Sequence, residues 1–453
     1  MTALLFDKGP AEHPSPSQAA QAAAGRPRLR VPHRDQIEMH WASLDELLED
    51  DHRARLVWTA VAGLRLDCWL DEIKAVEGSV GRDATDPRLL VALWVYATLE
   101  GVGSARELAR LCKQHLAYQW LCGGVTVNYH MLADFRSQGG DKWDELLTQI
   151  VASLLAEGLV TMTRVAQDGM RVRASAGKAS FRRRGRLESF LEEAREQVET
   201  LKQLADESPE ELSQRQRAAR QRAARERAER IEEAIRNCEQ LRAEREARAK
   251  IACEPAKEAR ASTTDPEARN MKFANGGYSP GYNVQFSTET AGGVIVGVAV
   301  TNVGNDGGEL PPMLEQIEER YDCCPGEALV DGGFATKEAI RDAAENHDCT
   351  VYAPLKDEEK QRAKGTDPHA PKKGDSAAVA AWRARMGTDT AKAIYRLRCQ
   401  TAEWVNAMAR NRGLWQMPLR GQRKCRTVAV MYAITHNLVQ ALKLRTEAIQ
   451  MSG

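Results

Sequence analysis

The chain has 453 residues, a length that indicates two to four domains. Lys and Arg total 64 and Asp and Glu total 64, so the net charge is zero, which argues against a protein that simply coats nucleic acid with positive charge. The longest apolar runs fall far short of the roughly 20 residues that span a bilayer, and the N-terminus lacks an export signal. We therefore expect a cytoplasmic protein without membrane contact.

The ten cysteines form no CxxC pair, and the adjacent Cys323 and Cys324 make a poor zinc clamp. In a chain without an export signal, thiols stay reduced. Most of them are expected to be small buried apolar residues.

Residues 1–35 are rich in Pro, Ala and Gln and end in a cluster of arginines at positions 26, 28, 30 and 34. This composition predicts a flexible basic arm that could touch phosphates. A solvated terminus without a function is the alternative.

Residues 36–160 have a helical pattern and are predicted to form an all-α N-terminal domain. Asp86, Ser104 and Asn128 each stand where a helix N-cap is expected, and Gly158 closes the last helix. Short helices around the Gly123-Gly124 turn, with arginines nearby, are compatible with a DNA-binding helix-turn-helix. A purely structural helical bundle would give the same pattern.

Residues 182–255 interrupt the next domain with charged heptads. The apolar positions of the first run are Leu187, Leu191, Ala194, Val198 and Leu201, and those of the second are Ala224, Ala228, Ile231, Ile235 and Cys238. A Ser208-Pro209 break separates them. The pattern predicts an antiparallel helical hairpin inserted into a larger domain.

The rest of 161–445 alternates between strands and helices. A strand over 162–168 ends in Asp168, strands over 282–289 and 294–301 form an antiparallel hairpin, and a helix follows over 307–321. Further strands are expected over 327–333, containing Asp331, and 350–354, separated by a helix over 335–347; a mobile polar loop over 356–377 and helices over 395–413 and 426–445 follow. Without the insertion, this order predicts an α/β fold with an RNase H-like mixed sheet.

Three carboxylates converge in such a fold: Asp168 on the first strand, Asp331 after the fourth, and Glu403 on a late helix. Mg²⁺ prefers oxygen ligands, and two such ions about 4 Å apart can serve both the attacking and the leaving oxygen of a phosphodiester. Chance is the alternative, because the chain has 64 acidic residues and Asp is common in turns. Glu338 is a rival third carboxylate, although it follows Asp331 too soon and lies on the wrong helix.

Several segments carry a resemblance to a known family. They are residues 86–112, 165–177, 265–272, 281–289, 329–340 and 401–421. In these segments the chain resembles the DDE transposases of bacterial insertion sequences. The resemblance implies Asp168 and Asp331 as the two aspartates, Glu403 as the glutamate, and two Mg²⁺ ions, with Mn²⁺ as a substitute.

The implied activity is DNA strand cleavage and strand transfer at the terminal inverted repeats of an insertion sequence. The implied partners are double-stranded DNA, as repeat ends and as target, and at least one further copy of the chain. The implied place of action is the bacterial nucleoid. A DNA-binding relative without catalysis and a Mg²⁺-dependent nuclease of the same fold are the rival functions, and no Walker loop indicates ATP use.

Many relatives carry a Tyr-Arg-Glu-Lys signature, and Tyr395, Arg398, Glu403 and Arg410 resemble it here. The gap between Arg398 and Glu403 is one residue longer, and arginine replaces lysine. The predicted DNA contacts are Tyr395, Arg398, Arg410, Arg412, Arg171 and Arg173.

The late helices also carry aromatic residues whose roles are open. Trp404 and Trp415 stand among basic residues and could stack on exposed bases, but we expect them to pack into the core instead. His436, in an apolar helix, is expected to be a core residue.

Overall fold

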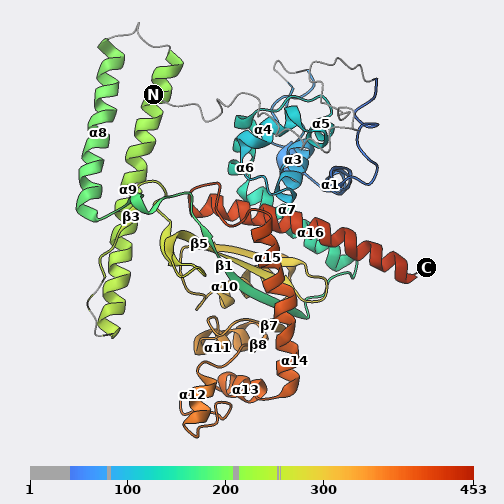
Figure 1. The fold of residues 1–453 in the computed structure, drawn as a ribbon, viewed down its shortest axis with the longest axis vertical. Helices are drawn as coiled ribbons and strands as arrows, with labels where there is room; N and C mark the ends of the chain where they lie inside the picture. Colours follow the sequence, from blue (N-terminus) through green and yellow to red (C-terminus); the bar gives the residue numbers. More distant parts are fainter. Residues whose placement is uncertain (1–40, 79–82, 208–213, 253–254, 256, 453) are drawn as a thin grey trace, which may run out of the picture. The chain divides into compact units, whose positions relative to one another are not determined.

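The computed structural model describes residues 41–78, 83–207, 214–252, 255 and 257–452 (Figure 1). Residues 1–43 and Leu44–Gly453 are two separate units, and every element described below belongs to the second. The predicted basic arm at 1–35 and the Ser208-Pro209 break lie outside the described residues.

The N-terminal part of this unit is helical. Its helices are α1 (Arg53–Ala62), α2 (Asp67–Leu70), α3 (Pro87–Leu99), α4 (Ala105–Gln114), α5 (Leu116–Cys122), α6 (Tyr129–Gln138) and α7 (Gly140–Ala156). The three predicted N-caps are confirmed. Asp86 accepts a hydrogen bond from the Arg88 amide at 2.8 Å, Ser104 from the Glu107 amide at 3.3 Å, and Asn128 from the Met131 amide at 2.9 Å. Nearly the whole of α3 is buried, so this helix forms the centre of the helical part.

A mixed sheet follows, and its strand order accounts for the position of the acidic residues. The strands are β1 (Arg164–Arg173), β4 (Arg269–Lys272), β5 (Tyr278–Glu289), β6 (Ile295–Thr301), β7 (Glu327–Leu329) and β8 (Thr350–Tyr352). β1 pairs antiparallel with β5 and parallel with β7, and β7 pairs parallel with β8. β4 and β6 pair antiparallel with successive parts of β5. The predicted antiparallel hairpin is thus β5 and β6, and the fold is a mixed α/β fold.

β1 is longer than the sequence predicted. It continues for five residues beyond Asp168 and stays paired with β5 as far as Arg173, opposite Gly281. Asp168 therefore lies within the strand and not at its end. The backbone pairing with β5 extends the strand through Arg171 and Arg173 although their side chains are polar.

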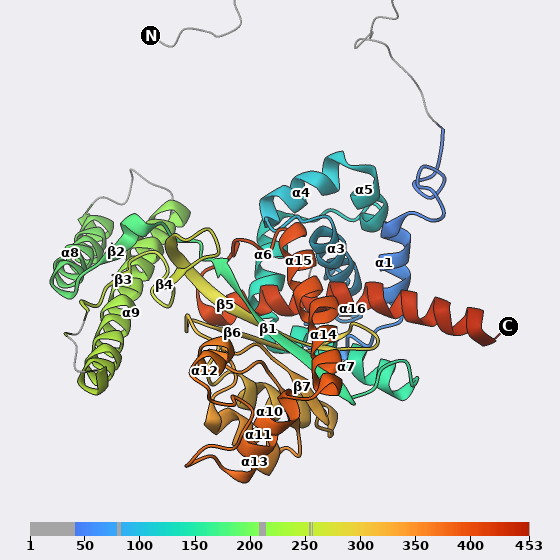
Figure 2. The same ribbon diagram turned by 60° about the horizontal axis from the view of Figure 1, so that its bottom comes forward.

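Helices cover both faces of this sheet (Figure 2). On one face α10 (Leu310–Tyr321) packs against β6, where Gly297 leaves room for Met313. On the other face Phe286 of β5, the partner of Asp168 in the register, contacts Tyr432 of α16 (Gln422–Ser452). α16 also packs against α3 and α7, so the C-terminal helix joins the helical part to the sheet.

The predicted hairpin consists of α8 (Arg184–Glu207) and α9 (Gln214–Ala252), which run side by side in Figure 1. Leu187, Ala194, Ile231 and Cys238 of the predicted seams are buried. The short strands β2 (Phe181–Arg182) and β3 (Ala261–Ser262) pair at its base. Ion pairs such as Arg195–Glu232, at 2.8 Å, link the outer faces of the two helices.

The remaining helices are α11 (Lys337–Asn346), α12 (Glu358–Ala363), α13 (Ala377–Met386), α14 (Asp389–Arg398) and α15 (Trp404–Asn411). The expectation of a loop over 356–377 was only partly right, because α12 lies within it. Asp375 further anchors the segment through ion pairs with Lys337 at 2.9 Å and Arg383 at 2.7 Å. Within the described residues, no helix has the length and apolar character needed to cross a membrane.

Candidate active site

Asp168 and Asp331 come together through the parallel pairing of β1 and β7. The last registered pair of these strands is Ala166 and Leu329, and each aspartate lies two residues further along its own chain. Because side chains two residues apart share a face of a strand, the two carboxylates leave the sheet on the same side and next to each other. Asp331 then turns the chain, with its Oδ1 accepting a hydrogen bond from the Gly333 amide at 2.6 Å.

Glu403 reaches the same place on a helix that changes its winding. α14 ends at Arg398, residues Cys399–Glu403 form a π-helical turn, and α15 continues from Trp404. The π-helical turn and the first part of α15 contact β1 and β5. An isolated π-turn within an α-helix accommodates one extra residue, and such turns are frequent at functional sites.

This π-turn explains the departure from the signature spacing. In an α-helix, residues four apart face the same side, whereas in a π-turn residues five apart do so. Arg398 and Glu403 are five apart and directly bonded, with 2.7 Å between Arg398 Nη1 and Glu403 Oε1. The extra residue is therefore absorbed without turning Glu403 away from the aspartates.

The guanidinium of Arg398 is the centre of the acidic cluster. Its Nη2 lies 2.7 Å from Asp168 Oδ1, so one arginine bridges a strand carboxylate and a helix carboxylate. The Arg398 side chain is only 11% exposed, which makes these ion pairs stronger than ordinary surface pairs. Arg398 is predicted from the sequence to contact DNA, whereas in the structure its charge is turned inward to the carboxylates.

Asn406 is a site residue that the sequence analysis missed. Its Nδ2 donates to Asp168 Oδ2 at 2.9 Å, while the Gly169 amide donates to Asp168 Oδ1 at 3.0 Å. Asn406 is buried and stands three residues after Glu403, on the same side of the helix. That spacing was the available signal, although an asparagine among the mainly apolar residues of α15 does not by itself indicate a site.

The electrostatics of the cluster follow from burial and from the neighbouring charges. Burial raises the pKa of Asp168, and the nearby Asp331 adds to this, while Arg398, Asn406 and the Gly169 amide act in the opposite direction. Burial also raises the pKa of Tyr395, whose neighbours include Asp331, Glu403 and Asp168. For Arg398, burial lowers the pKa, but the surrounding anionic groups outweigh it and the net shift is upward.

Three carboxylates on separate elements make an all-oxygen donor set. Such a set suits a hard divalent cation, which is bound by one or two carboxylates together with water and substrate phosphate. Burial raises the pKa of Asp168 and so penalises its ionised form, which a cation bound beside it would stabilise. The residues present therefore fit a divalent metal ion.

The opposite face of β1 supports Asp168 from behind. Asn283 and Gln285 donate to Asp306 Oδ1 at 2.7 and 2.8 Å. A Cβ atom at Gly169 would lie only 2.2 Å from that same oxygen. Glycine at position 169 therefore lets this buried polar layer pack against the strand directly behind Asp168.

The predicted DNA contacts take different positions. Tyr395 lies beside the acidic cluster, and Arg410 is exposed on α15. Arg171 donates to the carbonyls of Lys272 and Gly304 at 2.7 and 2.9 Å, and Arg173 stacks over the ring of Phe273. These two guanidinium groups thus also hold the edge of the sheet together.

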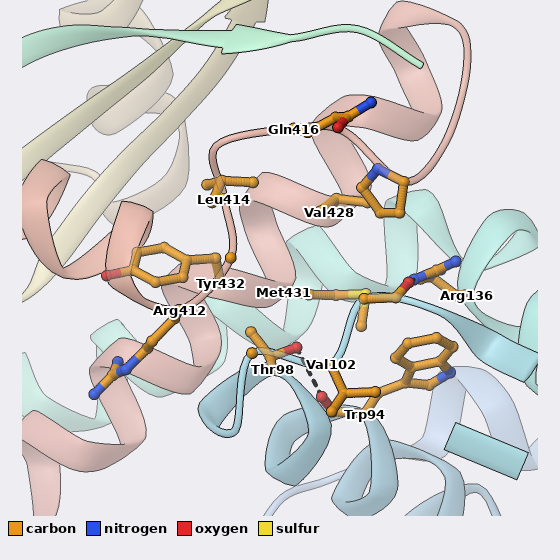
Figure 3. Close-up of a pocket in the computed structure, with 14 residues that line it drawn as sticks. Trp94, Thr98, Val102, Arg136, Arg412, Leu414, Gln416, Val428, Met431 and Tyr432 are labelled. Atoms are coloured by element: carbon orange, nitrogen blue, oxygen red, sulfur yellow. Dashed lines mark hydrogen bonds between the residues drawn. The ribbon is translucent and has the colours of Figure 1, made fainter. Parts of the chain in front are cut away.

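Arg412 lines a different cavity, about 80 Å³ in volume, between the helical part and α16. Figure 3 shows Arg412 and Tyr432 on one side of this pocket, with Trp94 and Arg136 on the other. Nη1 of Arg412 is buried. A DNA contact by Arg412 stays a prediction, and it requires this buried end of the side chain to move.

The expectation for the two tryptophans was wrong. Trp404 is 39% exposed and Trp415 is 54% exposed, because they lie at the start of α15 and in the turn after it. His436, by contrast, is buried as predicted, with its Nε2 2.8 Å from the Gly293 carbonyl oxygen. Burial lowers the pKa of His436 to about 4, so this side chain is neutral near pH 7.

Several arginines that follow Glu403 in the sequence are used within the chain. Arg426 pairs with Asp144 and Arg423 with Asp141 at 3.3 Å, both on α7. Arg420 donates to the Ser175 carbonyl at 3.2 Å. These arginines help to hold the helical part and the sheet together.

Two family models match the chain. Residues 42–138 match a transposase domain (DUF772), and residues 341–442 match a transposase DDE domain. No curated protein and no solved structure matches. The second range contains Tyr395, Arg398 and Glu403, whereas Asp168 and Asp331 lie outside both ranges. Together the two matches support the assignment of this chain to the DDE transposases of the insertion-sequence type.

Proposed function

We propose that the protein cleaves DNA at the terminal inverted repeats of an insertion sequence and joins the freed ends to target DNA. Asp168, Asp331 and Glu403 are its proposed catalytic and metal-binding residues. The observation that carries this proposal is their convergence from β1, the end of β7 and the π-turn around the guanidinium of Arg398. DNA as substrate also puts the proposed place of action at the nucleoid in the bacterial cytoplasm.

The strand order supports an RNase H-like fold for the proposed catalytic domain, residues 161–445. Three antiparallel strands, β6, β5 and β1, are followed by the parallel pairs of β1 with β7 and β7 with β8. The hairpin of α8 and α9 is then an insertion after the first strand. The helical part, within 36–160, is the proposed DNA-binding domain.

Two Mg²⁺ ions, or Mn²⁺ in their place, are the proposed cofactors, and when bound they polarise phosphodiester oxygens and lower the pKa of water. Neighbouring residues of the chain hold the proposed metal ligands in position. Asn406 and the Gly169 amide fix the orientation of Asp168 on β1. The π-turn points Glu403 towards Asp168, and Gly333 fixes the carboxylate of Asp331.

The proposed reaction has two steps. In the first, a water oxygen attacks a phosphorus atom at the element end, the bond from phosphorus to the 3′ oxygen breaks, and a 3′-hydroxyl is released. In the second, that hydroxyl oxygen attacks a phosphorus atom of the target strand and displaces another 3′ oxygen, so one phosphodiester replaces another. Neither step needs a covalent bond to the protein.

Basic and aromatic groups near the cluster are the proposed DNA contacts. Arg410 is exposed on α15 and can give phosphate two hydrogen bonds. The exposed indoles of Trp404 and Trp415 offer surfaces on which an unpaired base can stack. Tyr395, Arg398, Arg412, Arg171 and Arg173 complete the proposed set. Because both ends of an element must be handled, we further propose a homodimer or a higher oligomer.

The test is Mg²⁺-dependent cleavage and joining of DNA that carries the cognate terminal repeats. Asp331→Asn should reduce cleavage by at least about 100- to 1,000-fold, the effect of removing one group that stabilises a transition state. Asp389→Asn is the matched control, because Asp389 is fully exposed on α14 and pairs only loosely with Lys392, at 3.4 Å. Full activity of Asp331→Asn would refute the assignment. Cleavage without joined products would favour a nuclease instead.

A further inference from the structure

A second cluster of ligating side chains lies at the other end of β7. It consists of Glu318, Cys324 and His347, and one ligand atom from each lies within 4.8 Å of the other two. Cys324 precedes β7 by three residues, whereas Asp331 follows that strand by two. The two clusters are therefore separated by the length of a short strand.

The local backbone explains how these three residues meet. α10 ends at Tyr321, and its C-cap Asp322 has a left-handed φ of 54°. The chain therefore turns sharply and places Cys324 beside the last turn of α10, which carries Glu318. His347 is the C-cap of α11, and Asp348 follows with a φ of 47°. Because β7 and β8 are parallel, the helix ends that precede them lie at the same edge of the sheet.

The imidazole of His347 has a carboxylate near each of its ring nitrogens. Its Nδ1 lies 2.9 Å from Glu318 Oε2, and its Nε2 lies 3.8 Å from Asp342 Oδ2. Asp342 is held in turn by Asn346, whose Nδ2 donates to its Oδ1 at 2.6 Å. One ring nitrogen thus contacts the cluster, and Asp342 lies close enough to the other to become its hydrogen-bond partner after a small shift.

We propose that Glu318, Cys324 and His347 bind a Zn²⁺-class transition-metal ion, with a water molecule as the fourth ligand. One sulfur, one nitrogen and one oxygen donor suit zinc in a tetrahedral geometry, whereas Mg²⁺ prefers oxygen donors alone. On binding, the Cys324 thiol releases its proton to solvent and a bond from sulfur to the metal forms. The ion would tie the end of α10 to the end of α11. This site is independent of the proposed DNA chemistry.

The adjacent Cys323 and Cys324 are not expected to form a zinc site as a pair, and the geometry agrees. Only Cys324 belongs to the cluster, and its partners stand six residues before it and 23 after it. No short motif would connect these positions. The site depends on the meeting of two helix ends.

The experiment uses the full-length chain, purified with a phosphine reductant, freed of metal by chelation and titrated with Co²⁺ as the probe. Binding at this site should give the visible bands of tetrahedral Co²⁺ and a near-ultraviolet band from thiolate to metal, with one ion per chain. Zn²⁺ should abolish both bands, and excess Mg²⁺ should leave them. Zn²⁺ should also raise the melting temperature.

Cys324→Ser should remove the thiolate band and the thermal shift, and Cys323→Ser is the matched control that should keep both. Asp342→Asn should weaken Co²⁺ binding about 10- to 100-fold while keeping the spectrum, as expected for a group that only orients His347. Glu318→Gln changes an exposed side chain and keeps the test valid if Cys324→Ser fails to fold. An unchanged thiolate band in Cys324→Ser, or unchanged Co²⁺ affinity in Glu318→Gln, would overturn the proposal.

Discussion

The two ends of β7 offer different chemistry within one short strand. At the end that carries Asp331, the donors are carboxylate oxygens, and the guanidinium of Arg398 holds two of the carboxylates. At the end that carries Cys324, the donors are a sulfur, a nitrogen and an oxygen that already lie within 4.8 Å of one another. The comparison teaches that the donor atoms, and not the number of charged residues, separate a site for a hard ion from a site for a thiophilic ion.

The two ends also differ in how they are assembled. Asp168, Asp331 and Glu403 span more than 200 residues and meet only when the sheet and the last helices are complete. Glu318, Cys324 and His347 lie within 30 residues and need only α10, α11 and the strands that follow these helices, β7 and β8. We therefore expect the geometry of the carboxylate cluster at Asp331 to respond to changes throughout the sheet. The cluster at Cys324 should respond only to local changes.

We expect the largest difference between the clusters at the two ends of β7 when one metal ion is exchanged for another. In chelated protein, Mg²⁺ should restore DNA cleavage by at least about 1,000-fold, which corresponds to the several kcal/mol that such ions supply to a transition state. Zn²⁺ alone should not restore cleavage, although it should bind at Cys324. The measurement is cleavage of repeat-end DNA with each ion alone.

Cys324→Ser is the control for this exchange, and it should keep Mg²⁺-dependent cleavage. Equal activity with Zn²⁺ and Mg²⁺ would erase the distinction between the two ends. A loss of cleavage in Cys324→Ser as large as that in Asp331→Asn would show that the two clusters act as one site.

Gly169→Ala should disturb the carboxylate cluster at Asp168 and Asp331 without affecting the cluster at Cys324. The added Cβ would lie 2.2 Å from Asp306 Oδ1 and 2.6 Å from Gln285 Nε2, so the buried layer or the strand must shift. Such overpacking costs about 1–3 kcal/mol of unfolding free energy. Denaturant unfolding measures the loss, and Co²⁺ binding at Cys324 should remain. Gly177→Ala, where a Cβ meets nothing within 4 Å, is the control. Equal stability of the two variants would contradict the packing argument.

Arg398→Gln tests whether the guanidinium competes with a cation for the same oxygens. Removing one partner of a fully buried ion pair costs about 3–5 kcal/mol, but Asp168 and Glu403 are 19% and 48% exposed, so we expect about 1–3 kcal/mol in the metal-free protein. Mn²⁺ affinity should rise by roughly tenfold, equivalent to about 1.4 kcal/mol. Calorimetric titration measures the Mn²⁺ affinity, and thermal unfolding measures the stability.

The control is Arg396→Gln, at an exposed position two residues earlier, which should change neither quantity. Unchanged Mn²⁺ affinity in Arg398→Gln would show that the guanidinium and the cation do not compete.

Much of the fold could be predicted because its signals are local. The caps at Asp86, Ser104 and Asn128 depend on side chains that bond to amides two or three residues away, and all three formed. The order of strands and helices also followed from hydrophobic periodicity. From that order alone, Asp168 and Asp331 could be expected next to each other.

The rest depends on contacts between distant segments. Nothing near Asn406 in the sequence indicates that its amide meets Asp168, 238 residues earlier. The exposure of Trp404 depends on which side of α15 meets the sheet, and a half-turn error reverses the expectation. The inward direction of Arg398 likewise follows from the π-turn, which local propensity does not predict.

Deletion of Gln400, an exposed residue of the π-turn, should have the smallest effect. If the turn only absorbs one extra residue, its removal leaves a continuous α-helix in which Arg398 and Glu403 are four apart and still share a face. Cleavage should then stay within about tenfold of the unaltered chain, since no more than about 1.4 kcal/mol of positioning is lost. Deletion of exposed Ala393 is the matched control, because a residue removed from regular α-helix rotates everything after it by about 100° and should abolish cleavage. Equal losses in the two deletions would mean that the π-turn itself, and not the shared helix face, positions Glu403. The carboxylate cluster at Asp331 would then depend on a local irregularity of one helix, as the cluster at Cys324 depends on the ends of α10 and α11.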